Sequence, residues 1–142
     1  MAVALDSDTV VGFLDRSDAL HEAANKAVRE YARTERLVVS AVTFAEVMTG
    51  ARIDHHDEAI VAGFFDQVIT DVLPVDLEVA DRAATLRANH RSLKMPDALI
   101  AATADLAPAV EVLVTGDEAV SKLRRLGCRI KRINATRYFP GR

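Results

Sequence analysis

The chain has 142 residues, of which half are hydrophobic and 27% are charged, with a single cysteine and a formal net charge of −3. These values indicate one compact domain over residues 1–142 and exclude disordered, collagen-like and disulfide-rich chains. No apolar stretch approaches the ~20 residues of a membrane span, and Asp6 interrupts the start too early for a signal peptide. We therefore expect a soluble cytoplasmic protein with no membrane partner.

The charges are unevenly distributed along the chain. Residues 122–142 contain eight basic residues and no acid, whereas residues 1–121 contain all 21 acids and the other ten basic residues. A basic surface beside an acidic site suits a polyanion that is held by its phosphates. Alternatively, these lysines and arginines solvate a last helix and protect an edge strand from pairing.

The first half of the chain predicts two strands and four helices. Val3–Leu5 is an apolar run that ends at Asp6, and the apolar spacing predicts a helix over Thr9–Leu14. The next expected elements are a helix from Asp18 to about Arg33, a strand over Leu37–Val39, a helix capped by Ser40 or Thr43, and a helix from Asp54 through Ile69.

The second half continues the alternation of strand and helix. Pro74 makes Val72–Val75 a predicted edge strand, because proline donates no hydrogen bond to a central ladder. We then expect a helix from Asp76 or Leu77, a buried apolar helix over Met95–Ala102, a strand over Val110–Val114, a helix over Glu118–Leu126 that Gly127 stops, and a last strand over Arg129–Ile133. This order predicts an α/β sandwich with a mostly parallel sheet of about five short strands.

Four acids follow predicted strands or begin predicted helices: Asp6, Glu46, Asp97 and Asp117. Because parallel sheets bind ligands beyond the carboxyl ends of their strands, we expect these acids at one rim. Each alone has a structural explanation, as a cap, a helix-dipole partner, a turn residue or an ordinary helix glutamate. The apolar neighbours of Glu46 and Asp97 predict that both face inward, where carboxylates without a nearby Lys or Arg need a hard cation.

Four segments resemble, in order, the acidic motifs of PIN-domain ribonucleases and especially the VapC toxins of bacterial toxin–antitoxin pairs: AVALDSDTVVGFLD, VVSAVTFAEVMTGA, KMPDALIAATA and VLVTGDEAV. Their acids stand 40, 51 and 20 residues apart, and order and spacing together fit the family. The first motif differs, since the chain has Asp6-Ser7-Asp8 where the family often has Asp-Thr-Ser or a similar triplet. Asp8 is therefore either a fifth charge of the site or a helix cap.

The resemblance implies a PIN-like α/β/α sandwich and a metal-dependent endoribonuclease that arrests growth until a cognate antitoxin neutralises it. It implies one or two Mg²⁺ or Mn²⁺ ions held by the four acids, with Asp6 and Asp97 as the most direct ligands. Further candidates are Thr115, Asp8 and Ser7 in support of the site, and Arg87 and Lys94 as contacts to RNA phosphate. A homodimer is also expected, with part of the apolar stripe around Phe64, Phe65, Val68 and Ile69 available to an antitoxin helix.

Two other functions remain open from the sequence. Asp6-Ser7-Asp8-Thr9-Val10 also resembles the nucleophile motif of haloacid-dehalogenase phosphohydrolases, in which Asp6 would be the nucleophile and Ser40 would bind phosphate. That interpretation gives no role to Glu46 or to the helix over Met95–Ala102, and the second aspartate that such enzymes need after Gly116-Asp117 is missing. The other alternative is a PIN-fold binding module without catalysis.

Overall fold

The computed structural model describes residues 1–54 and 57–135. Its elements in chain order are β1 (Ala2–Leu5), α1 (Ser7–Leu14), α2 (His21–Ala32), β2 (Arg36–Ser40), α3 (Ala41–Asp54), α4 (Glu58–Gln67), β3 (Asp71–Leu73), α5 (Leu77–Asn89), α6 (Met95–Leu106), β4 (Val110–Thr115), α7 (Glu118–Ser121) and β5 (Arg129–Arg132).

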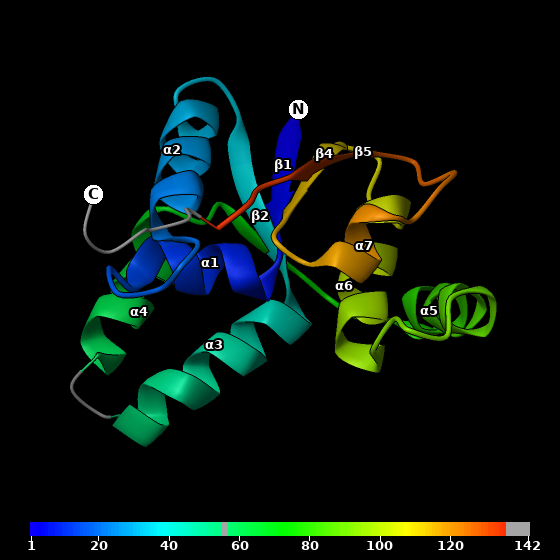
Figure 1. Ribbon diagram of the computed structural model, residues 1–142, viewed down its shortest axis with the longest axis horizontal. Helices are drawn as coiled ribbons and strands as arrows, with labels where there is room; N and C mark the ends of the chain where they lie inside the picture. The colour runs from blue at the N-terminus through cyan, green and yellow to red at the C-terminus, as the bar shows by residue number, and fades with distance from the viewer. Residues whose placement is uncertain (55–56, 136–142) are drawn as a thin grey trace, which may run out of the picture.

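The strands form one sheet in the order β3-β2-β1-β4-β5, and every neighbouring pair is parallel. In Figure 1, α1, α2 and α4 lie on one side of the sheet, and α5, α6 and α7 lie on the other. The predicted α/β sandwich is therefore confirmed, with a sheet that is wholly parallel. The predicted edge strand is also confirmed, because β3 is outermost, but it ends at Leu73 and leaves out Pro74 and Val75, which the prediction had included.

Alternate side chains of β1 enter two different cores. Val3 and Leu5 pack into a cluster with α2, α3 and α4, whereas Ala2 and Ala4 pack into a second cluster with α5 and α6. Both faces of the strand are covered, which is why its sequence is apolar throughout. α6 is deeply buried, as predicted, but no helix in residues 1–54 and 57–135 combines the length and apolar composition needed to cross a membrane.

Three predicted helix boundaries are wrong. Asp54 ends α3, and α4 begins only at Glu58. α2 begins at His21, because the Asp18 carboxylate accepts the Leu20 N–H in a turn that precedes the helix. α7 ends at Ser121 and not at Leu126: the N–H groups of Lys122 and Leu123 donate to carbonyl oxygens three residues back in a tighter turn, and Arg125 farther on adopts a left-handed φ of 57°. That backbone conformation interrupts a right-handed helix before Gly127 is reached.

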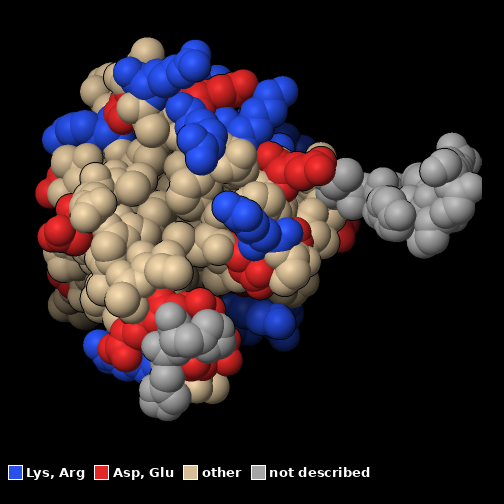
Figure 2. Space-filling model, turned by 90° about the vertical axis from the view of Figure 1, so that its left-hand side faces the viewer, with Lys and Arg blue, Asp and Glu red and all other residues tan. Residues whose placement is uncertain are grey.

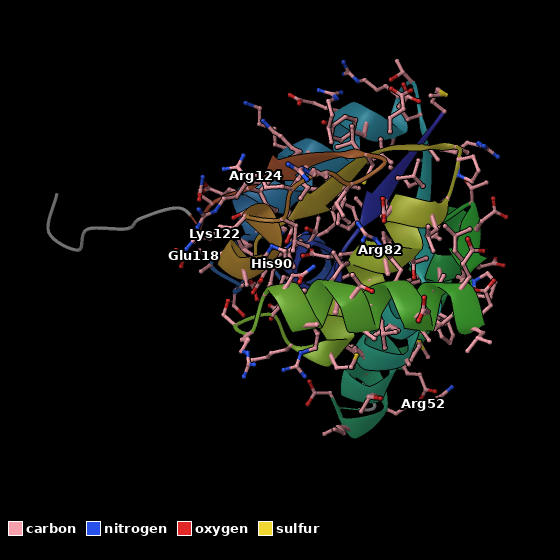
Figure 3. All side chains as sticks on the ribbon, turned by 90° about the vertical axis from the view of Figure 1, so that its right-hand side faces the viewer. Arg52, Arg82, His90, Glu118, Lys122 and Arg124 are labelled. Carbon is pink, nitrogen blue, oxygen red and sulfur yellow. The ribbon has the colours of Figure 1, made fainter. Side chains whose placement is uncertain are left out.

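The carboxylate of Asp105 joins three segments on the α5 and α6 side of the sheet. It accepts the Arg82 Nε–H of α5 at 2.7 Å and the backbone N–H of Gly127 at 2.5 Å. Only 9% of the Asp105 side chain is exposed, whereas both members of the Glu118–Lys122 pair are exposed (Figure 3). A Cβ atom at Gly127 would lie 2.6 Å from the Asp105 carbonyl oxygen, so this approach requires glycine.

We expect Asp105→Ala to lower the free energy of unfolding by roughly 2 kcal/mol, because it leaves the Arg82 and Gly127 donors without their buried acceptor. The midpoint of urea unfolding measures this change. Glu118→Ala is the matched control, since removing an exposed ion pair has little effect on stability. Equal effects of the two substitutions would contradict the structural role of Asp105.

Candidate functional site

The candidate site lies where β1 and β4 end side by side. These strands are the point at which the chain order of the sheet reverses, and such switch points open a crevice at the carboxyl edge. α1 begins directly after β1, and α7 begins after β4 (Figure 1). α3 follows β2 and α6 precedes β4, so both also present their N-terminal turns at this edge.

Asp6 is the most buried acid of the site, with 3% of its surface exposed. It caps α1 by accepting the N–H and the hydroxyl of Thr9, at 2.9 and 2.7 Å, and it accepts the Thr115 hydroxyl of β4 at 2.5 Å. Burial raises the pKa of Asp6 to about 6, although these three hydrogen bonds lower it. Capping α1 and facing the site are thus two roles of one carboxylate.

Thr9 was not among the site residues predicted from the sequence. It is fully buried, and its hydroxyl also lies 3.1 Å from the carbonyl oxygen of Val114 in β4. The sequence did contain a signal, because a residue three positions after a capping Asp is the usual donor to that cap.

Thr115 connects two of the predicted acids, Asp6 and Asp117. While its hydroxyl donates to Asp6, its oxygen accepts the backbone N–H of Asp117 at 3.0 Å. The Asp117 carboxylate in turn caps α7 by accepting the N–H of Val120 at 2.9 Å. Asp117 is therefore held next to Asp6 by the end of β4.

Asp97 is half-buried in the first turn of α6, as predicted, and within the described part of the chain it forms no hydrogen bond or ion pair. Its pKa is raised to about 6, first by burial and then by the negative charges of Asp117, Asp8, Asp6 and Glu46. An acid whose ionisation is opposed by four others lies within electrostatic reach of all four. The structure thus brings the four predicted acids together and adds Asp8.

Asp8 is exposed on α1, yet its carboxyl takes part in the same repulsion. Its pKa is raised by desolvation and then by Asp117 and Glu46, whereas the positive charge of Lys94 lowers it. Lys94 directly precedes α6 and is exposed. This predicted RNA contact therefore lies close enough to act on the acidic group, whereas Arg87 lies farther back along the chain on α5.

The predicted inward orientation of Glu46 is wrong, because the residue is exposed. The buried residues of α3 include Thr43, Val47 and Ala51, which are four positions apart and share one face of the helix. Glu46 lies off that face, although its sequence neighbours are apolar. It still reaches the site, since the Ser7 hydroxyl of α1 donates to Glu46 Oε1 at 2.7 Å.

The basic segment after α7 is a surface feature. Its described basic residues are all exposed, on the segment between α7 and β5 and on β5 itself: Lys122, Arg124, Arg125, Arg129, Lys131 and Arg132. Arg137 and Arg142, which also contribute to the predicted basic surface, lie outside the described residues.

Burial and the charge of Asp105 raise the pKa of the Cys128 thiol to about 11, so it is protonated at neutral pH.

The acidic group has the right chemistry for a hard divalent cation but is not preformed around one. All its donors are carboxylate oxygens, which Mg²⁺ and Mn²⁺ prefer. In residues 1–54 and 57–135, no three His, Cys, Asp or Glu side chains are arranged to hold a metal ion as they stand. Asp6 and Asp117 are held by their helix caps, whereas Asp97 has no such hydrogen bond, so a cation held by all three would need the Asp97 side chain to rotate.

The family model of the PIN domain matches residues 3–126, a range that contains all five acids. The chain belongs to the PIN domain family. This assignment excludes the haloacid-dehalogenase alternative, in which Asp6 would be a nucleophile. Among curated proteins, none matches the chain in sequence.

Several solved structures are similar to this PIN domain. VapBC2 from Rickettsia felis, bound to a promoter DNA fragment, has a TM-score of 0.73 and 15% identity over 96% of this chain and all of that one. A toxin–antitoxin complex from Klebsiella pneumoniae has a TM-score of 0.69 and 24% identity over 86% of this chain and 92% of that one. VapC20 from Mycobacterium tuberculosis, a toxin that cleaves the sarcin–ricin loop, has a TM-score of 0.69 and 16% identity over 89% of this chain and 98% of that one. At these identities the likeness concerns the fold.

We expect Asp97→Asn to stabilise the metal-free protein at pH 7.5. Since the folded state raises the Asp97 pKa to about 6, its ionised form is disfavoured there. This carboxyl therefore contributes stability below about pH 4, its pKa in the unfolded chain, and that contribution is lost as the pH rises through 6. After allowance for solvent screening the gain is about 1 kcal/mol, or roughly 4 °C in Tm.

Thermal melts in EDTA at pH 4.5 and 7.5 measure this effect, with Asp66→Asn on the exposed surface of α4 as the control. The advantage of Asp97→Asn over the wild type should be larger at pH 7.5 than at pH 4.5. The same Tm difference at both pH values would show that Asp97 is not under repulsion.

Proposed function

We propose that this PIN domain is a VapC-type toxin, an endoribonuclease that depends on Mg²⁺ or Mn²⁺ and cleaves RNA phosphodiester bonds. The observation that carries the proposal is the gathering of acids at the switch point of the sheet, where Thr115 joins Asp6 to Asp117, Ser7 joins α1 to Glu46, and the surrounding negative charges raise the pKa of Asp97. Membership of the PIN family and the fold of the toxin structures support it.

Asp6 and Asp97 are the proposed direct metal ligands, and Glu46 and Asp117 bind directly or through water. The ion would lower the pKa of a bound water and neutralise charge that develops on the scissile phosphate. Among the residues of the chain, Thr115 favours the ionised form of Asp6 by donating its hydroxyl. Ser7 holds Glu46 toward α1.

RNA approaches a site that is itself negative, so basic groups around the rim are needed to hold it. Lys94 is the proposed nearest contact, because its charge already acts on Asp8. The exposed lysines and arginines of β5 and of the segment between α7 and β5 add a positive surface after the strand that carries Thr115. A homodimer, which the family resemblance implies, is part of the proposal and is tested by light scattering.

We further propose that a cognate antitoxin binds the apolar groove between α1, α3 and α4. The groove has a volume of about 470 Å³, and its lining includes Val11 and Ile60, which are 39% and 64% exposed. Figure 2 shows a broad uncharged surface on the side of the molecule where α2 and α4 lie. Of the stripe predicted for this role, Phe64, Phe65 and Ile69 are buried and belong to the core.

The groove residues also suggest the chemistry of the antitoxin segment. Its charged lining consists of three aspartates and Arg16, so an amphipathic segment with apolar anchors and basic flanks would complement it. The similar structures from Rickettsia felis and Klebsiella pneumoniae are themselves toxin–antitoxin assemblies, which supports a protein partner of this kind.

For the nuclease we expect Asp6→Asn and Asp97→Asn each to reduce Mg²⁺-dependent RNA cleavage at least about 100-fold, because each removes a ligand charge. Cleavage of total RNA by the purified variants measures this, and sequencing of the new RNA ends identifies the substrate. Induced expression of the wild type should arrest growth, and both variants should relieve the arrest. Asp66→Asn should behave as the wild type at equal abundance, and undiminished toxicity of the Asp6 and Asp97 variants would contradict the proposal.

For the antitoxin groove we expect Ile60→Asp to weaken neutralisation by the cognate antitoxin, because it places a charge on the apolar lining. Cells that express this variant together with the antitoxin should remain arrested, whereas cells that express the wild-type protein together with the antitoxin should grow. Leu77→Asp is the matched control, since Leu77 is 85% exposed on α5. Recovery of growth with Ile60→Asp would place the antitoxin on another surface.

A further inference from the structure

A second hollow lies on the hairpin formed by α5 and α6. It has a volume of about 600 Å³ and is lined by Ala84, Arg87, Ala88, Arg91 and Met95. Its volume falls in the range of about 300–1,000 Å³ that is usual for small-ligand sites. The two alanines leave the space open, and Met95 offers an apolar wall that is 42% exposed. The two arginines make this hollow positively charged, with no acid in its lining.

The Nε–H group of Arg87 is the distinctive feature of this hollow. Among the side-chain nitrogen and oxygen atoms of residues 1–54 and 57–135, it is the one that is buried without a hydrogen-bond partner. Buried donors in folded proteins are nearly always satisfied, so an unsatisfied one calls for an explanation. The guanidinium of arginine stays protonated at every physiological pH, so the Nε–H of Arg87 remains a donor that lacks an acceptor.

Arg87 and Arg91 lack the acidic partners that some other basic residues of the described chain have. Arg82 on the same helix pairs with Asp105 at 2.7 Å, and Lys122 pairs with Glu118 at 3.2 Å. Within the described residues, the side chains of Arg87 and Arg91 form no hydrogen bond or ion pair. They therefore present two uncompensated positive charges toward one space.

The hollow lies beside the carboxylate site. Arg87 is near the end of α5, and the short connection from His90 to Lys94 leads directly into α6, whose first residue is Met95. Figure 3 shows His90 at the end of α5 from which this connection leaves. Asp97 follows Met95 by two positions, and Lys94 acts on Asp8. A substrate that enters the acidic site is therefore within reach of the hollow.

We infer that Arg87 and Arg91 form a subsite that binds a phosphate group of the RNA substrate flanking the scissile bond. The planar guanidinium with several N–H donors matches a phosphate in charge and geometry. Because the Arg87 Nε–H is buried, the side chain would have to turn toward the hollow for this donor to gain the acceptor it lacks. Met95 would pack against the adjoining sugar or base. This inference rests on the proposed nuclease function. An acidic protein segment is the competing occupant, and proximity to the acidic site favours RNA.

The test uses a fluorescein-labelled, 12-nucleotide, single-stranded RNA with 2′-O-methyl groups throughout, which binds without being cleaved. Its affinity for the wild type, Arg87→Gln, Arg91→Gln and Arg87→Lys is measured by fluorescence anisotropy at several KCl concentrations. Arg33→Gln, at the end of α2, is the matched control, because Arg33 is exposed like Arg91 and lies outside the hollow. Circular dichroism verifies that each variant is folded. Because Arg91 is exposed, Arg91→Gln keeps the test valid if Arg87→Gln is unstable.

Each glutamine substitution in the hollow should weaken RNA binding about 5-fold to 10-fold and reduce the slope of log K against log salt by roughly 0.7, the value of one lost phosphate contact. Arg87→Lys should retain the slope with intermediate affinity, and Arg33→Gln should change neither. If the wild type cleaves RNA while both glutamine variants bind like Arg33→Gln, the subsite is wrong and the nuclease function stands.

Two further outcomes would also overturn the inference. If the glutamine variants lose only their capture of the antitoxin, the hollow belongs to an acidic protein segment. If the wild type neither binds nor cleaves RNA, the proposed function fails and the subsite fails with it.

Discussion

The buried carboxylate of Asp6 joins the two central strands at the edge where the acids of this chain meet. It caps α1 through Thr9 and accepts the hydroxyl of Thr115, while its backbone N–H donates to Val114 of β4. These contacts fix where α1 leaves β1 and how β4 ends, and they thereby place Asp117. The pKa of Asp6 is still raised to about 6, because burial disfavours the ionised form more than the hydrogen bonds from Thr9 and Thr115 favour it.

The acids around Asp6 also disfavour ionisation at the same edge of the sheet. Asp97 experiences the charge of four other carboxylates and has no donor of its own in the described chain, although it sits in the first turn of α6. A divalent cation would reverse the sign of these interactions and so favour ionisation of the whole group. Under the proposed function, the same repulsion means that an RNA substrate would need separate basic contacts. The uncompensated arginines beside α6 are placed where one such contact would be useful.

Element order and the meeting of the acids could be predicted because both follow from local patterns. Apolar periodicity marks strands and helices, and a parallel sheet brings every strand end to one edge. The orientation of Glu46 could not be read from its neighbours, since residues adjacent in sequence lie on different faces of α3. The early end of α7 comes from the tight turn at Lys122 and Leu123, with a left-handed Arg125 farther on, and the role of Thr9 includes a contact to β4 that lies 105 positions away. The arginine hollow became visible only when packing left the Nε–H of Arg87 without an acceptor.

Metal affinity is the most direct test of the view that these acids form one cation site. The affinity of the metal-free protein for Mn²⁺ can be measured by isothermal titration calorimetry, with the free ion followed by electron paramagnetic resonance. The account predicts saturable binding by the wild type and by Asp66→Asn, and affinity at least about 10-fold weaker for Asp97→Asn. Equal affinity of the wild type and Asp97→Asn would contradict it.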